Sequence, residues 1–194
     1  MRLIKKFERD EKTDFVSRIF DGVIIKNPFP LPFSRMELHI RDYDVTVFDT
    51  EKAIICLNYN NPLILEMDER GVRTLLLHEI FRLMLRVNQP RLIEDVMVGR
   101  AMILRGYGED LFYVYYNELM KSKHEETRAS FLKASIPWVI FYGLDEYNSK
   151  FLKVLAGKLH KRKFPETSKF LAILCKLSDK NLKGAVKEYK NFIE

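Results

Sequence analysis

Residues 74–83 read TLLLHEIFRL and form the most apolar part of a longer stretch with helical periodicity. The apolar positions recur at intervals of three and four, at Val72, Leu75, Leu76, Ile80, Leu83, Met84 and Val87. Asp68 and Glu69 stand just ahead of them, where the positive end of a helix dipole favours negative charge. The stretch therefore predicts a helix that is apolar on nearly all sides and lies at the centre of the fold.

Short strands are predicted ahead of this helix. Residues 36–40 alternate apolar with polar side chains, and the apolar runs 45–48 and 53–57 flank a turn at 49–52. Alternation is typical of a half-buried strand, and two apolar runs around a short loop predict a hairpin. We expect a small, mostly antiparallel sheet of three or more strands packed on helices, so the fold class is α+β.

Helices are predicted on both sides of this sheet. Residues 13–25 carry apolar side chains at helical spacing, and the proline-rich stretch NPFPLPF at 27–33 ends that helix. After the central helix, further helices are predicted over 90–104, 109–121, 131–142, 150–160, 166–177 and 181–192. Pro137 predicts a kink or break in one of them. We expect an α+β core over 1–122 and a helical subdomain over 123–194, packed together as one compact unit.

The distribution of charge argues against binding of nucleic acid. The 194 residues include 33 Lys and Arg against 27 Asp and Glu, a formal charge of +6. The basic residues are interspersed with acids, and no stripe of basic and aromatic residues appears. Lys161, Arg162 and Lys163 follow a predicted helix, where cations complement the helix dipole. A surface this heavily charged in both signs is typical of heat-adapted proteins.

Targeting and membrane segments are not predicted. Charged residues interrupt every apolar run before the roughly 20 residues that a membrane span needs, and no signal-peptide core follows Met1–Lys6. We therefore expect a soluble, cytoplasmic protein with no membrane partner. Cys56 and Cys175 share no metal-ligand spacing and are predicted to be buried thiols.

The pair His78-Glu79 begins the zinc protease motif HExxH, which this chain does not complete. A helix turns by about 100° per residue, so the two histidines of that motif project from one face and bind one zinc ion. The glutamate then polarises a zinc-bound water. Arg82 occupies the position of the second histidine. Because arginine stays protonated and only donates hydrogen bonds, it cannot be a metal ligand.

The order of elements around this pair strengthens the connection with metallopeptidases. A predicted strand, IICLN at 54–58, is followed by a loop, by the helix that contains His78 and Glu79, and by a helix that opens with RLIEDVMVGR at 91–100. This succession, over about residues 45–105, resembles the minimal core of the zincin metallopeptidases of the gluzincin type. The resemblance implies that the strand binds extended peptide and that the second helix supplies a ligand.

The resemblance also implies roles for individual residues. His78 matches the first zinc ligand, Glu79 the general base, and Glu94 the third ligand, with Asp95 beside it. Arg82 matches the missing histidine and would place a permanent positive charge near the zinc position, opposite Glu94. An ion pair between Arg82 and Glu94 would preserve the fold and abolish zinc chemistry.

We therefore expect a vestigial site without a cofactor, in a degenerate metallopeptidase that is not an enzyme. Its role would be binding, regulatory or structural, toward a protein or peptide partner that the sequence does not identify. One alternative is a zinc-dependent hydrolase or peptidase with an altered site, built from His78, Glu94, Asp95 and a residue of the last third such as His124 or His160. A second alternative is a basic helical module that binds nucleic acid or protein. Glu94 and Asp95 also suit the first turn of a helix without any role in a site.

Overall fold

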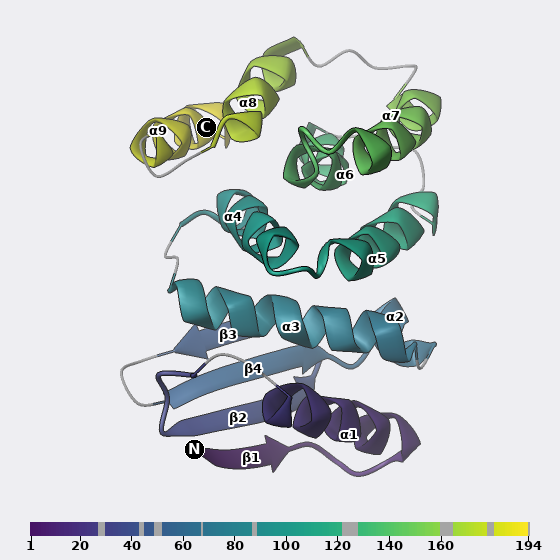
Figure 1. Ribbon diagram of the computed structural model, residues 1–194, viewed down its shortest axis with the longest axis vertical. Helices are drawn as coiled ribbons and strands as arrows, with labels where there is room; N and C mark the ends of the chain where they lie inside the picture. The colour runs from purple at the N-terminus through teal and green to yellow at the C-terminus, as the bar shows by residue number, and fades with distance from the viewer. Residues whose placement is uncertain are drawn as a thin grey trace. The chain divides into compact units, whose positions relative to one another are not determined.

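The computed structural model describes residues 1–26, 30–42, 45–48, 52–66, 68–86, 89–121, 128–159, 165–177 and 181–193. The chain divides into two compact units, Met1–Val87 and Asn88–Glu194, and each is described by itself. The predicted division between residues 122 and 123 falls within the second unit, at positions outside the described residues. Figure 1 shows strands in the first unit and helices alone in the drawn parts of the second.

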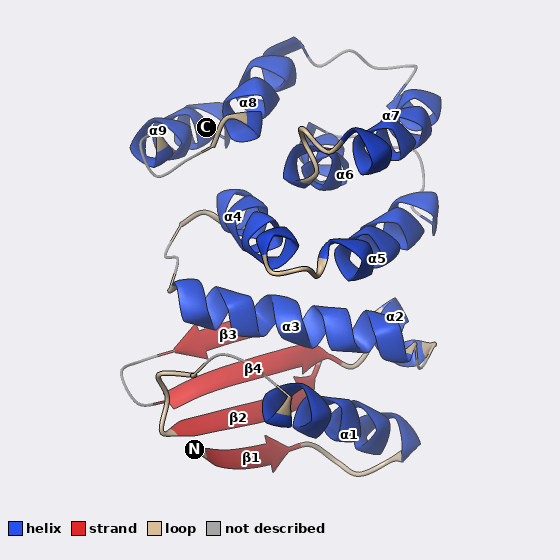
Figure 2. Ribbon diagram, in the orientation of Figure 1, coloured by secondary structure: helices blue, strands red, loops and turns tan. Residues whose placement is uncertain are grey.

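The first unit combines a sheet with helices (Figure 2). Its elements are β1 Arg2–Lys6, α1 Glu11–Ile25, β2 Arg35–Arg41, β3 Val45–Phe48, β4 Lys52–Asn58, α2 Pro62–Leu65 and α3 Glu69–Leu85. The described elements of the second unit are α4 Arg91–Leu104, α5 Gly108–Lys121, α6 Arg128–Ile140, α7 Asp145–Leu159, α8 Pro165–Cys175 and α9 Leu182–Ile193. The α6 helix continues through Pro137, where a kink or break was expected.

The sheet has the strand order β1-β2-β4-β3, and most of it is parallel. β1 pairs with β2 and β2 pairs with β4 in parallel, whereas β3 runs antiparallel to β4. The prediction of a mostly antiparallel sheet is therefore wrong. The predicted hairpin is confirmed, since Phe48 of β3 pairs with Ala53 of β4. What differs from the prediction is the direction of β2 and β4, which run parallel to each other.

The parallel order has a physical origin in the sequence. A strand, a helix and a strand in succession form a crossover unit whose two strands run parallel, and β1, α1 and β2 form such a unit. The β1 strand contributes only Leu3 and Ile4 as apolar residues, so no alternation marks it. The run from Ala53 to Leu57 is apolar on both faces, a pattern that is more typical of parallel strands than of half-exposed antiparallel ones.

Helices α1 and α3 pack against each other and cover one face of the sheet (Figure 1). The side chains buried on this face belong to β2 and β4 and are Met36, Leu38, Ile40, Ala53, Ile55 and Leu57. The long helix predicted around TLLLHEIFRL is confirmed as α3. Its N-cap is Asp68, whose carboxylate accepts a hydrogen bond of 2.8 Å from the backbone N–H of Gly71. Every residue from 71 to 83 is buried except Arg73 and Leu75, so α3 is the core helix of this unit.

The second unit is held together by an arginine and an aromatic cluster. Arg100 of α4 donates four hydrogen bonds of 2.9–3.1 Å, and its acceptors are the backbone carbonyls of Val139, Leu174, Cys175 and Leu177. These carbonyls lie at the C-terminal ends of α6 and α8, where a helix leaves its last C=O groups without partners of its own. Phe112, Phe141 and Phe151 bring α5, α6 and α7 together through ring contacts.

Within the described parts of the chain, no helix is long and apolar enough to span a membrane.

Candidate functional site

The three residues of the incomplete zinc motif lie together on α3. His78, Glu79 and Arg82 are all buried. The Nη1 atom of Arg82 donates a hydrogen bond of 2.5 Å to Oε2 of Glu79, and Nδ1 of His78 lies 3.4 Å from Oε1 of the same carboxylate. The side chains of Arg82 and Glu79 are only 3% and 6% exposed. The Glu79 carboxylate is therefore held between an imidazole and a buried guanidinium.

This arrangement decides what Glu79 can do. A general base takes a proton from water, and an ion pair with a permanent cation stabilises the carboxylate in its charged form and makes it a poor proton acceptor. Arg82 also fills the helix position, four residues after His78, from which a second ligand would project. The zinc ion that the resemblance implies therefore does not fit this donor set.

Arg82 was predicted to pair with Glu94, and within α3 it forms an ion pair with Glu79. A pair between Arg82 and Glu94 would join the two units and stays a prediction. Glu94 is buried on α4, in the second unit, so the expected approach of His78 and Glu94 joins the two units and stays a prediction. Oδ1 of Asp95 lies 3.4 Å from Nε of Arg91, four residues earlier on the same helix, and side chains four residues apart are neighbours on a helix surface. The alternative ligands His124 and His160 fall outside the described residues.

The strand expected to bind extended peptide is not at an edge of the sheet. β4 pairs with β2 on one side and with β3 on the other, so its backbone N–H and C=O groups already belong to two ladders. A peptide can add only to a strand that has an unpaired edge. The edges of this sheet are β1 and β3. The peptide-binding role expected for residues 54–58 is therefore wrong.

A buried carboxylate marks the second face of the sheet, opposite α1 and α3. Glu37 of β2 is fully buried, with four basic side chains of β1, β2 and β4 around its oxygens. The contacts are Lys6 Nζ at 3.0 Å, Arg35 Nη2 at 2.6 Å, His39 Nε2 at 2.8 Å and Lys52 Nζ at 3.3 Å. The hydrogen bond with His39, followed by those from the lysines and the charge of Arg35, lowers the pKa of the Glu37 carboxyl to about 2 despite its burial. We call this group the Glu37 cluster.

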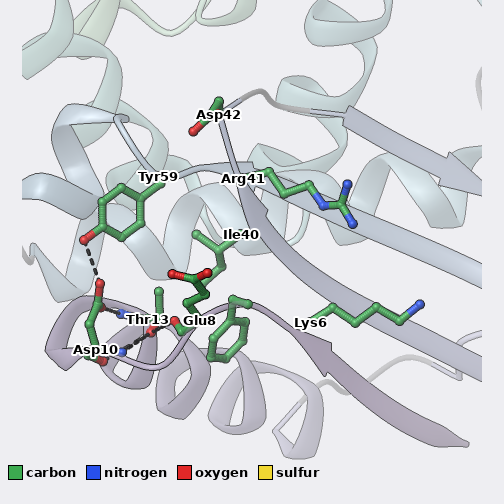
Figure 3. A pocket seen from close by; sticks show the side chains of 9 residues that line it. Lys6, Glu8, Asp10, Thr13, Ile40, Arg41, Asp42 and Tyr59 are labelled. Carbon is green, nitrogen blue, oxygen red and sulfur yellow. Dashed lines mark hydrogen bonds between the residues drawn. The ribbon is translucent and has the colours of Figure 1, made fainter.

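A pocket of about 750 Å³ opens where β1, β2 and β4 end (Figure 3). Its polar lining comes from Lys6, Glu8, Asp10, Thr13, Arg41, Asp42 and Tyr59. The carboxyl ends of parallel strands are where open α/β sheets commonly bind ligands. Asp10 also caps α1, because its Oδ1 accepts from the backbone N–H of Thr13 at 2.8 Å, and its Oδ2 accepts from the Tyr59 hydroxyl at 2.7 Å. The Thr13 backbone hydrogen bond, followed by the Tyr59 hydroxyl, lowers the pKa of Asp10, and the Asp10 carboxylate raises the pKa of Tyr59.

Comparison with other proteins adds no assignment to these sites. No family model, no curated protein and no solved structure matches this chain. Within the described ranges, no three His, Cys, Asp or Glu side chains gather closely enough to hold a metal ion.

The Glu37 cluster and the pocket were not predicted from the sequence. A parallel strand order is needed before Lys6, Glu37 and Lys52 become neighbours, and the sheet was expected to be antiparallel. The signal that was available is the alternation Arg35, Glu37, His39, because a charged residue at every second position marks one face of a strand.

Proposed function

We propose that this chain is a catalytically degenerate zincin-like protein, a pseudo-metallopeptidase whose role is binding, regulatory or structural. The observation that supports the proposal is the buried ion pair between Arg82 and Glu79. Arg82 stands where the motif would have its second histidine ligand, and its charge pairs with Glu79, which would be the general base. Both losses affect the chemical step, while the helix that carried the motif stays intact in the core.

The ion pair also explains how Glu79 can remain buried in α3 without a zinc ion beside it. A glutamate that is 6% exposed is costly to bury as an isolated charge, by several kcal/mol. With Arg82 on the next turn, the charge of Glu79 is compensated within α3. The guanidinium thus takes over the electrostatic role that a metal ion would have in the resembling family. We propose a protein or peptide partner and a cytoplasmic location.

The test is a peptide hydrolysis assay with zinc added to the native protein and to Glu79→Gln. We expect the native protein to show no hydrolysis above the Glu79→Gln background, because neither a complete ligand set nor a free base is present. Hydrolysis that needs zinc and is lost in Glu79→Gln would contradict the proposal and favour the altered metallohydrolase. Melting curves of both proteins establish that each one is folded.

A further inference from the structure

The pocket at the ends of β1, β2 and β4 has charged groups of both signs in its wall (Figure 3). These groups are Lys6, Glu8, Asp10, Arg41 and Asp42. Lys6 pairs at 3.0 Å with Glu37, which is not part of the wall. Asp10 accepts its hydrogen bonds from the backbone N–H of Thr13 and from the Tyr59 hydroxyl, which are both uncharged. Within the described part of the chain, none of the five groups forms an ion pair with another, so opposite charges face one cavity without compensating each other.

The positive and negative groups point toward different sides of the pocket. In the view of Figure 3, the Glu8 carboxylate lies toward Asp10, whereas the side chains of Lys6 and Arg41 extend away from both. The Asp42 carboxylate and the Arg41 guanidinium also point in opposite directions. Lys6 is already paired with a carboxylate outside the wall, whereas Arg41 has no ion pair among the described residues. The pocket therefore has an acidic side and a basic side, and Arg41 is the free cation on the basic one.

Two more cations lie near the acidic side without lining the pocket. The ammonium group of Lys12 lies over the Tyr59 ring, 5.3 Å from its centroid, and Arg9 is exposed in the segment ahead of α1. Glu11 and Asp14 bring two acidic groups to the first turn of the same helix. These two cations and two carboxylates compensate each other, so the groups in the wall decide which charge a ligand contacts.

A ligand with one ammonium group and one carboxylate group matches this arrangement. The planar guanidinium of Arg41 has a fork of N–H donors that suits a carboxylate. An ammonium group has three donors and no acceptor, and the carboxylates of Glu8 and Asp10 offer acceptor oxygens for it. A ligand of a single sign would leave one side of the pocket without a partner, whereas a zwitterion has a partner on each side.

The size and the position of the pocket favour a short peptide over a single amino acid. A compact space of about 750 Å³ is roughly 9 Å across, and an extended chain spans about 3.3–3.6 Å per residue, so about two or three residues fit. Phe7 and Ile40 add apolar surface to the wall, against which the side chains of a peptide can pack. The carboxyl ends of parallel strands are also where open sheets commonly bind ligands.

We propose that this pocket binds a short peptide with free termini, with its ammonium group at Glu8 and its carboxylate at Arg41. The hydrogen bonds of Asp10 with Thr13 and Tyr59 join the start of α1 to the residue that follows β4. These bonds fix the acidic side of the wall before a ligand arrives, and a preformed site loses less conformational entropy on binding.

The experiment is a calorimetric titration of the full chain with a tripeptide that has free termini and an apolar central residue. The same tripeptide is also tested with its amino terminus acetylated and with its carboxyl terminus amidated, and each block removes one charge. We expect saturable binding of the free tripeptide. Each blocked form should bind about tenfold more weakly, because each has lost one charge-assisted contact.

Two variants assign each end of the peptide to its partner. Arg41→Gln should bind the free and the amidated tripeptide equally, because the group that distinguishes them is gone, and should still prefer the free form to the acetylated one. Glu8→Gln should lose its preference for the free over the acetylated form and keep its preference for the free over the amidated form. Arg9→Gln and Glu11→Gln are the matched controls, because they remove the same charges next to the pocket without altering its wall, and both should bind like the native protein.

Three results would overturn the proposal. One is the absence of saturable binding of the free tripeptide by protein with a cooperative melting curve. Another is equal binding of the free and both blocked forms by the native chain. The third is a loss of affinity in either control as large as that in Arg41→Gln, which would show an effect of net charge alone. The pocket contains neither Arg82 nor Glu79, so any of these results leaves the proposal of a degenerate metallopeptidase unaffected.

Discussion

Arg82→Ala is expected to lower the free energy of unfolding by about 3 to 5 kcal/mol, which is the usual cost of removing one partner from a buried ion pair. The truncation leaves the Glu79 carboxylate, 6% exposed, without the guanidinium at 2.5 Å. Chemical denaturation of the variant and the native protein measures this difference. The thermal midpoint should fall by several degrees as well.

Two controls separate the loss of the ion pair from other effects of truncation. Arg73 lies on the same helix and is exposed, so Arg73→Ala should cost well under about 1 kcal/mol. The double variant Glu79→Leu/Arg82→Met replaces both charges with apolar groups, and it should recover much of the stability lost in Arg82→Ala. A melt of Arg82→Ala within about a degree of the native midpoint would contradict the account.

Arg100→Met is expected to lower the free energy of unfolding by about 3 kcal/mol, because a charged donor to backbone carbonyls contributes roughly 1.5 to 3 kcal/mol and this one has several acceptors. Its four hydrogen bonds close the C-terminal ends of α6 and α8, and methionine keeps the length of the side chain without any donor. Urea denaturation measures the loss.

The planar geometry of the guanidinium makes this prediction specific. Arg100→Lys should restore only part of the stability, since Nη2 alone contacts Val139, Leu174 and Cys175 while Nη1 reaches Leu177, and a lysine has no second nitrogen for that carbonyl. Arg91 lies on the same helix with a 55% exposed side chain, so Arg91→Met should change stability by less than about 1 kcal/mol. If Arg91→Met lowered the free energy of unfolding as much as Arg100→Met does, the loss would not depend on the four hydrogen bonds of Arg100, and the prediction would be contradicted.

The sequence predicts the helices of this fold better than its sheet, for a physical reason. The 3.6-residue periodicity around residues 74–83 and the cap at Asp68 are local signals, so α3 was predicted in the right place. The position of a strand within a sheet depends on residues far apart in the chain. The hairpin of β3 and β4 was visible in residues 45–57, whereas the pairing of β2 with β4 was not.

The residues of the candidate sites could likewise be predicted only where local geometry brings them together. His78, Glu79 and Arg82 are related by helix geometry, and their spacing alone places them on neighbouring turns. The ion pair of Arg82 with Glu79 follows from that geometry, whereas the pair with Glu94 that the family resemblance implies would join the two units and stays a prediction. The Glu37 cluster depends on pairing across three strands, so a wrong strand order conceals it.

We propose that Arg82 has taken the place of a metal ligand, and the zinc content of the purified protein tests this proposal. Native protein and Arg82→His are purified without chelator, incubated with zinc and dialysed against buffer without zinc, and the zinc bound per chain is then measured by mass spectrometry, with Arg73→His as the matched control. The account predicts no stoichiometric zinc in the native protein or in Arg73→His, and a gain of zinc in Arg82→His, whose new imidazole stands four residues after His78. One zinc ion per native chain, retained through dialysis and lost in His78→Ala, would contradict it.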